Sequence, residues 1–209
     1  MTTAPVIVPY GPGALLVDTP GRNPVVLAER LRDLPGVVDT VPGAATVLLT
    51  FSASAFSEAE AMAHFTAAVR TAWSEAAEDA PPDPQRLVIP VRYDGEDLPL
   101  IAERAAMTIE DVIERHSRPE YRVAFMGFAP GFGYLRGLDE MLHLPRLDSP
   151  RPSVPAGSVA IAGEYAAVYP RSSPGGWLLL GRTDMELFDT DAQPPALLRP
   201  GAVVKFEPR

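Results

Sequence analysis

Four arginines stand in loops where their side chains could bind a small anion. They are Arg146, Arg151, Arg171 and Arg182. An arginine guanidinium can hold a carboxylate or a phosphate through two parallel hydrogen bonds, so this group predicts a site for a small anionic ligand. The competing interpretation pairs these arginines with Asp139, Asp148 and Asp184 on the surface, where such ion pairs contribute little stability. For any one arginine, both interpretations remain open.

One histidine and several carboxylates are the candidates for proton transfer. His116 falls in the last turn of a predicted helix, where the helix dipole favours a histidine whether or not it is catalytic. No HxH or HExxH pair accompanies it, and the chain contains no cysteine, so we expect no metal site. A buried carboxylate with a raised pKa could act as general base. The sequence does not choose among Glu164, Asp184, Glu186 and Asp189.

The motifs of two common enzyme classes are not found here. No G-x-S-x-G elbow surrounds any serine, and Ser158 in AGSV is typical of a turn whose hydroxyl bonds to nearby backbone. The segment GFAPGFG at 127–133 lacks the GK[ST] ending of a phosphate-binding loop. We therefore do not expect this chain to bind a nucleotide by itself.

The residues around these groups predict rigid loops rather than a disordered linker. Between His116 and Arg182, glycines and prolines alternate with aromatic side chains that can be buried. We expect the loops 128–135, 146–158 and 172–182 to line one pocket. Aromatic residues in such loops pack in a core by default, and stacking on a ligand is the alternative.

Composition limits the classes of partner. The chain has 209 residues, 46% of them hydrophobic, and a formal net charge of −9, which disfavours binding to nucleic acid phosphates. No segment approaches the roughly 20 apolar residues that a membrane span needs, and the first residues lack the pattern of a secretion signal. We expect a soluble, cytoplasmic protein.

Residues 1–85 are predicted to form a small ferredoxin-like α+β lobe. Short apolar runs predict strands at 6–9, 14–18, 37–41 and 45–51. Helical spacing of apolar residues predicts one helix from residue 24 and a second that Ser57 and Glu60 cap. The order of elements indicates helices on one face of a mostly antiparallel sheet, followed by a proline-rich linker at 78–85 and a further strand at 87–93.

Residues 86–209 are predicted to form a β-barrel domain. Two helices are expected at 98–106 and 108–116, the second capped by Thr108 and Asp111. Short apolar runs then predict strands at 121–126, 159–162, 166–169, 177–180 and 203–206. Many short strands with glycine and proline connections are typical of a closed or nearly closed barrel.

Three segments carry a resemblance to a known family. GFAPGFGYL at 127–135, PRPSVPAGSVAIAG at 150–163 and SPGGWLLLGRT at 173–183 resemble the signature blocks of the allophanate hydrolase subunit 1, or kinase A inhibitor-like, family. Its bacterial members include the B subunit of the ATP-dependent 5-oxoprolinase. The resemblance covers residues 88–206, extends more loosely to the chain from Tyr10 onward, and implies that the barrel is cyclophilin-like. One departure is Gly201-Ala202, where the family commonly has a Gly-Asp pair.

The resemblance implies a function and a set of site residues. The activity would be hydrolysis of the cyclic amide of 5-oxoproline to L-glutamate, with ATP bound in the assembled complex and the A and C subunits of 5-oxoprolinase as partners. His116 and Arg151 would be catalytic. The substrate-binding residues would be Phe128, Gly131, Phe132, Tyr134, Arg146, Pro155, Gly157, Ser158, Tyr169, Gly175, Gly176, Trp177 and Arg182.

Two alternatives follow from other relatives of the same family. The chain could inhibit a sensor histidine kinase by docking its barrel on the kinase. It could also be a carboxyltransferase subunit in the urea or allophanate pathway. The sequence does not decide between these substrates and partners.

Overall fold

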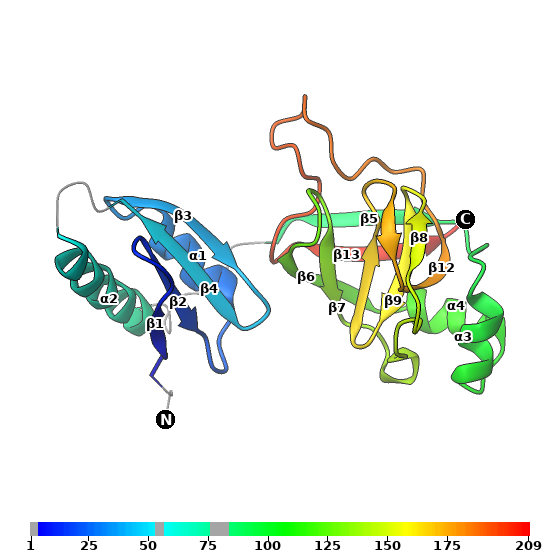
Figure 1. Ribbon diagram of the computed structural model, residues 1–209. Coiled ribbons are helices and arrows are strands. Elements are labelled where there is room, and N and C mark those ends of the chain that lie inside the picture. Colours follow the sequence, from blue (N-terminus) through cyan, green and yellow to red (C-terminus); the bar gives the residue numbers. More distant parts are fainter. Residues whose placement is uncertain (1–3, 53–56, 76–83) are drawn as a thin grey trace. The chain divides into compact units, whose positions relative to one another are not determined.

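The computed structural model describes residues 4–52, 57–75 and 84–209. Contacts divide the chain into a first unit that ends at residue 83 and a second unit that comprises residues 84–209 (Figure 1). Within the described residues, no helix combines the length and the apolar character that crossing a membrane would require.

The first unit is a four-stranded antiparallel sheet with two helices on one face. Its strands follow the order β1-β2-β4-β3 (Figure 1). The elements are β1 (Ile7–Pro9), β2 (Ala14–Asp18), α1 (Pro24–Arg32), β3 (Val37–Pro42), β4 (Thr46–Phe51) and α2 (Glu58–Glu75). The strands and helices predicted for this part of the chain are confirmed, with ends that differ by a few residues.

Alternation along the strands explains why both helices lie on the same face. Leu15 pairs with Leu49 and Val17 with Val47, and all four side chains point into the core shared with the helices. The helix α2 begins with the predicted capping box, in which the backbone N–H of Ser57 donates to Glu60. Apolar burial on this face holds the unit together.

The second unit is a nearly closed barrel, as predicted. Its seven-stranded sheet has the order β12-β9-β10-β7-β6-β13-β5, and all neighbours are antiparallel except β13 and β5. The strands are β5 (Arg86–Val91), β6 (Glu120–Met126), β7 (Gly133–Arg136), β9 (Ser158–Ala162), β10 (Tyr165–Val168), β12 (Leu178–Arg182) and β13 (Val203–Pro208). The strand predicted at 87–93 thus belongs to the barrel and not to the first sheet.

Two glycines allow the barrel to close between its edge strands. Arg92, just after β5, forms an antiparallel bridge with Arg182 of β12. A Cβ on Gly181 would lie 2.2 Å from the carbonyl oxygen of Arg92, and one on Gly95 would lie 2.2 Å from that of Leu179. Only residues without a side chain let the two backbones approach so closely.

Two helices and a short ribbon complete the second unit. The helices α3 (Leu98–Arg104) and α4 (Ile109–Ser117) lie together at one end of the barrel sheet (Figure 1), and a 3-10 helix η1 spans Glu140–Leu142. The strands β8 (Arg151–Val154) and β11 (Ser173–Gly175) pair as a separate antiparallel ribbon. The sequence predicted loops for β7, β8 and β11, and this was wrong. Prolines in β8 and β11 conceal the strand pattern, but a two-stranded ribbon tolerates proline.

Strands β9, β10 and β12 are buried on both faces. Their inward side chains, such as Val159 and Ile161, join the barrel core. Two of their outward side chains are alanines: Ala160 faces Ala167 on one side and Leu179 on the other, in a second cluster with Phe132 and Tyr169. The alanines leave room for the glycine-rich loops to pack against the outside of the barrel. This outer layer contains most of the predicted site residues.

Candidate functional site

The predicted site residues separate into two neighbouring cavities of the second unit. One, of about 270 Å³, is called the aromatic cavity; it is lined by Phe128, Phe132, Tyr134, Arg146, Pro150, Tyr169, Pro174, Gly175, Gly176 and Trp177. The other, of about 630 Å³, is called the acidic cavity; it is lined by Asp94, Gly95, Glu96, Ser153, Pro155, Ala156, Ser158, Leu179, Gly181, Arg182, Thr183 and Asp184. The β8–β11 ribbon contributes residues to both.

The aromatic cavity is built around the ring of Phe132. This side chain is 1% exposed, and it makes edge-to-face contacts with four other rings at centroid distances of 5.2 to 5.7 Å. The four rings belong to Phe128, Tyr134, Tyr169 and Trp177. Because aromatic pairs in this geometry attract each other, the rings fix one another and hold the cavity walls in place.

Gly175 gives the cavity its depth. A Cβ at this position would lie 2.2 Å from the hydroxyl oxygen of Tyr169, so any larger residue would displace that side chain. Gly131, which lies in the turn between β6 and β7, has φ +80°, and a Cβ there would lie 2.7 Å from the Cβ of Phe188. Gly131 therefore supports the turn that carries Phe128 and Phe132, although it does not line the cavity.

Phe128 is in an unusual conformation for an aromatic residue. Its φ is 65°, in the left-handed region, and its side chain is 61% exposed. A non-glycine residue in this region costs about 1–2 kcal/mol, and such strain clusters at functional sites. The surrounding turn holds the residue there, because the backbone N–H of Ala129 bonds to Gly127 and that of Phe132 bonds to Ala129. The ring is thereby kept at the cavity edge, partly in solvent.

Arg146 supplies the one charged group that lines the aromatic cavity. Its side chain is exposed and makes no ion pair or hydrogen bond with any residue that the structure describes. Burial raises the pKa of Tyr134 and of Tyr169 above the usual tyrosine value, so both phenols stay neutral near pH 7. The cavity thus combines apolar walls, neutral hydroxyls and one unpaired positive charge.

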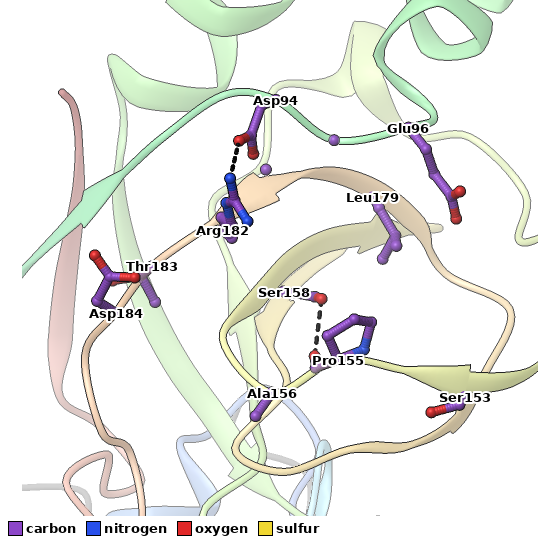
Figure 2. A pocket seen from close by; sticks show the side chains of 12 residues that line it. Asp94, Glu96, Ser153, Pro155, Ala156, Ser158, Leu179, Arg182, Thr183 and Asp184 are labelled. Atoms are coloured by element: carbon purple, nitrogen blue, oxygen red, sulfur yellow. Dashed lines mark hydrogen bonds and ion pairs between the residues drawn. The ribbon is translucent and has the colours of Figure 1, made fainter.

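The charged groups of the acidic cavity are paired with one another or with nearby residues. Figure 2 shows Arg182 donating to Asp94 at 2.8 Å and the Ser158 hydroxyl donating to the carbonyl of Pro155 at 2.8 Å. Asp184 pairs with Arg209. Three carboxylates and one arginine line this cavity, so its surface attracts cations and repels anions. The hydroxyl of Ser158 has the turn role that the sequence predicted.

Arg151 lies beside the acidic cavity and is held by two acidic residues. Its guanidinium donates to both carboxylate oxygens of Asp97 at 2.7 and 2.8 Å, and it pairs with Glu96 at 2.5 Å. The side chain of Asp97 is only 8% exposed, and it also accepts from the backbone N–H of Leu179 at 2.7 Å. This network joins α3, β8 and β12. It occupies the hydrogen-bonding fork that an anionic substrate would need.

His116 is enclosed in the barrel core and lines neither cavity. It is 0% exposed, and its ring packs on Phe206 and Tyr121 with centroid distances of 4.6 and 5.5 Å. Burial lowers its pKa to about 3, so the ring is neutral, and its Nδ1 lies 2.8 Å from the hydroxyl of Tyr93. These surroundings favour a structural role for His116.

Two of the acidic residues that the sequence suggested as partners of the loop arginines pair with other arginines. Asp139 pairs with Arg115 and Asp184 with Arg209, so neither of them holds one of the four loop arginines. The actual partners are Asp94, Glu96 and Asp97, which the sequence analysis did not single out. The signal available was the acidic run DGED at 94–97, directly after the strand β5. Gly157, with φ +79°, adjoins the acidic cavity against Thr183.

No group of three or more histidine or acidic side chains suited to a metal ion occurs among the described residues. The segment 127–132 joins two antiparallel strands, β6 and β7, whereas a phosphate-binding loop joins a strand to a helix. This turn is therefore not a phosphate-binding loop of that class.

The sequence is similar to proteins of known family. The family described as "Carboxyltransferase domain, subdomain C and D" matches residues 6–198. A relative from Escherichia coli O157:H7, named as the B subunit of 5-oxoprolinase, is 41% identical over 186 residues, which cover 88% of this chain and 83% of the relative. The protein of the same name from Bacillus subtilis is 48% identical over 136 residues, 64% of this chain and 57% of that relative.

Solved structures agree with these similarities. The crystal structure of a protein called TTHA0988 has a TM-score of 0.79 and 35% identity; the match covers 94% of this chain but only 39% of that one. A conserved uncharacterized protein from Pyrococcus horikoshii has a TM-score of 0.58 and 33% identity, with 98% and 97% of the two chains covered. The Kluyveromyces lactis urea carboxylase, at 20% identity and a TM-score of 0.74, shares the fold.

The family resemblance found in the three glycine-rich segments is thus confirmed from independent directions. The family match extends over both units and includes the lining of the aromatic cavity. The chain belongs to the family of carboxyltransferase domains, subdomains C and D.

Proposed function

We propose that this chain is the B subunit of an ATP-dependent 5-oxoprolinase complex. The observation that carries the proposal is the relative named as the B subunit of 5-oxoprolinase, which is 41% identical over 83% of its own length. Similarity of this extent over both units supports a shared activity rather than a shared fold alone. The substrate would be 5-oxoproline and the product L-glutamate.

The proposed reaction opens the lactam ring of 5-oxoproline and uses ATP to activate its carbonyl group. Water adds to the lactam carbonyl, the ring C–N bond breaks, and the nitrogen takes up a proton to become the amine of glutamate. Transfer of a phosphoryl group from ATP to the amide oxygen would activate this carbonyl, and phosphate would then leave as the ring is opened. The developing negative charge requires donors such as backbone N–H groups or arginine side chains.

The proposal divides this work between the chain and its partners. The turn at 127–132 does not have the strand-to-helix geometry of a phosphate-binding loop, so ATP would be bound by companion chains. We assign these roles to the A and C subunits of 5-oxoprolinase, the latter of which would resemble allophanate hydrolase subunit 2. A reaction that consumes ATP would take place in the cytoplasm.

Within the proposal, Arg151 and His116 are structural residues rather than catalytic ones. The fork of Arg151 is engaged by Asp97 and Glu96, and His116 lies in the core, so neither reaches a small ligand directly. Arg151 would instead hold α3 against the β8–β11 ribbon. We assign substrate binding instead to residues that line a cavity and whose hydrogen-bonding groups have no partner among the described residues.

The test is reconstitution of the activity. The chain would be expressed with its companion chains, and glutamate formation from 5-oxoproline would be measured with and without ATP. We expect activity only when all chains and ATP are present, and loss of activity when this chain is omitted. If no combination forms glutamate, the proposal is wrong. In a pull-down from lysate, binding of a sensor histidine kinase to this chain in place of companion chains would point to the inhibitor alternative.

A further inference from the structure

We propose that the aromatic cavity is a binding site for a small cyclic carboxylate, with Arg146 as the counter-ion of the carboxylate group. The identity of the natural ligand as 5-oxoproline rests on the proposed function. The site itself rests on the geometry of the cavity.

The charge of the aromatic cavity favours an anionic ligand. Arg146 is the one charged residue that lines it, and it has no partner among the described residues. Arg182 and Arg151, by comparison, are engaged by Asp94, Asp97 and Glu96. A guanidinium without a partner can bind a carboxylate through two hydrogen bonds without first breaking an ion pair.

The size and walls of the aromatic cavity suit a small cyclic ligand. A volume of about 270 Å³ suits a metabolite rather than a peptide or a nucleotide. The rings of Tyr169 and Trp177 both pack edge-to-face on Phe132, at 82° and 88°, which gives the cavity a rigid aromatic wall against which a five- or six-membered ring can lie. Apolar walls contribute to binding by burying the ring, and the neutral hydroxyl of Tyr134 can bond to its polar atoms.

An exposed aromatic residue, Phe128, lies at the edge of the aromatic cavity. Phe128 lines the cavity and the residue is 61% exposed, although its backbone is in the costly left-handed region. Its ring lies 5.2 Å from that of Phe132 and 6.4 Å from that of Tyr169. A bound ligand would cover part of this ring, so the exposed apolar area would be buried on binding.

The acidic cavity does not compete for the same ligand. Asp94, Glu96 and Asp184 line it, and each of them already attracts an arginine. An anion that entered would lie among carboxylates and would have to displace one of them from its guanidinium. Coulomb repulsion therefore directs an anionic ligand to the aromatic cavity.

The experiment uses the fluorescence of Trp177. The chain has two tryptophans, and Trp73 lies in the core of the first unit, so the substitution Trp73→Phe leaves Trp177 as the single reporter. This protein would be titrated with 5-oxoproline and with 2-pyrrolidinone, which has the same ring without the carboxylate. We expect saturable quenching by 5-oxoproline and binding at least about tenfold weaker for 2-pyrrolidinone.

Two arginine variants test the role of the charge. Arg146→Gln should weaken 5-oxoproline binding about tenfold or more, because a charge-assisted pair is lost. Arg171→Gln is the matched control: Arg171 is also exposed, has no ion pair with the described residues and does not line the cavity. Binding by this control should change less than about twofold. Equal effects of the two variants, or no binding of 5-oxoproline at millimolar concentration, would overturn the inference.

The outcomes separate the binding site from the proposed function. If the chain binds 5-oxoproline through Arg146 but no complex forms glutamate, the site stands and the proposed function fails. If the complex forms glutamate and Arg146→Gln leaves its KM for 5-oxoproline unchanged, the function stands and this site is wrong.

Discussion

The two cavities share the β8–β11 ribbon but use their charges in opposite ways. In the acidic cavity, Arg182 is paired with Asp94 at 2.8 Å, and the adjoining Arg151 is enclosed by Asp97 and Glu96. In the aromatic cavity, Arg146 has no partner among the described residues. The comparison teaches that an arginine in the predicted binding loops is available to a ligand only if the fold has left it without an acidic neighbour.

The largest effect is expected from Arg151→Ala. Asp97 would be left as a buried carboxylate without its cation, which costs about 3–5 kcal/mol in free energy of unfolding. Urea denaturation of the Trp73→Phe protein, followed through Trp177, would measure the stability of the second unit. This result would confirm that Arg151 is used for stability and sharpen its contrast with Arg146.

Arg182→Ala is the matched control for this measurement. Arg182 and Asp94 are both partly exposed, and exposed pairs contribute about 0–1 kcal/mol. The two variants remove the same side chain beside the same cavity, so the difference reports burial of the partner. Equal losses of stability in both variants would contradict the distinction between the pairs.

A second effect should distinguish one glycine in each cavity. In Gly181→Ala the new Cβ would meet the carbonyl oxygen of Arg92 at the barrel closure, where neither backbone can move freely, so we expect a loss of about 1–3 kcal/mol. In Gly175→Ala it would meet the hydroxyl oxygen of Tyr169, which is the far end of a side chain and not a backbone atom. That variant should lose less stability but weaken 5-oxoproline binding. Chemical denaturation and the fluorescence titration would measure the two losses, and the opposite ranking of stability losses would show that the closure is not rigid.

A third prediction concerns His116 and pH. Because folding lowers its pKa from 6.5 to about 3, the unfolded state binds more protons than the folded state between these pH values. The free energy of unfolding should therefore fall as the pH falls from about 6.5, by up to about 1.4 kcal/mol per pH unit from this residue alone.

The variant His116→Asn would test this assignment. Asparagine keeps a hydrogen-bond acceptor for Tyr93 but does not titrate, so its stability should depend less steeply on pH between about 6.5 and 3. His143→Gln serves as the control, since His143 is exposed. Identical pH profiles of the wild type and His116→Asn would exclude the buried neutral imidazole. Assembled complexes with His116→Asn should keep their KM for 5-oxoproline, because His116 lines neither cavity.

The smallest effect is expected at Phe128. With φ at 65°, Phe128→Gly should be more stable than Phe128→Ala by up to about 1 kcal/mol, because glycine alone adopts this conformation without strain. Both variants remove the ring, so both should weaken 5-oxoproline binding to a similar degree. Denaturation and fluorescence titration of the pair would separate strain from contact. Higher stability of the alanine variant would show that the backbone relaxes.

The sequence predicted the aromatic cavity better than the acidic one, for a physical reason. Phe128, Phe132 and Tyr134 lie on one turn and the start of the following strand β7, so their proximity follows from local sequence, whereas Trp177 is brought to them by the barrel. The pair of Arg151 and Asp97 joins residues 54 positions apart, and it forms only because the barrel brings α3 beside β8. No pattern in either segment encodes that contact.

The fold shows the same division. Short apolar runs bounded by turn residues located the strands of the first unit and most strands of the barrel, because buried strands consist largely of apolar residues. The barrel's closure between Arg92 and Arg182, and the parallel pairing of β5 with β13, depend on which distant strands become neighbours. The ribbon of β8 and β11 was missed because its prolines and glycines resemble those of a loop.

The position of β13 between β5 and β6 has a consequence during synthesis. While the ribosome is still making residues 127–202, β5 has emerged without the neighbour with which it will pair in parallel, and the edge of β6 is open. At usual translation rates this interval lasts on the order of ten seconds. The first unit can fold locally in that time, whereas the nascent second unit must keep two apolar strand edges from pairing with other chains until Val203–Pro208 arrives.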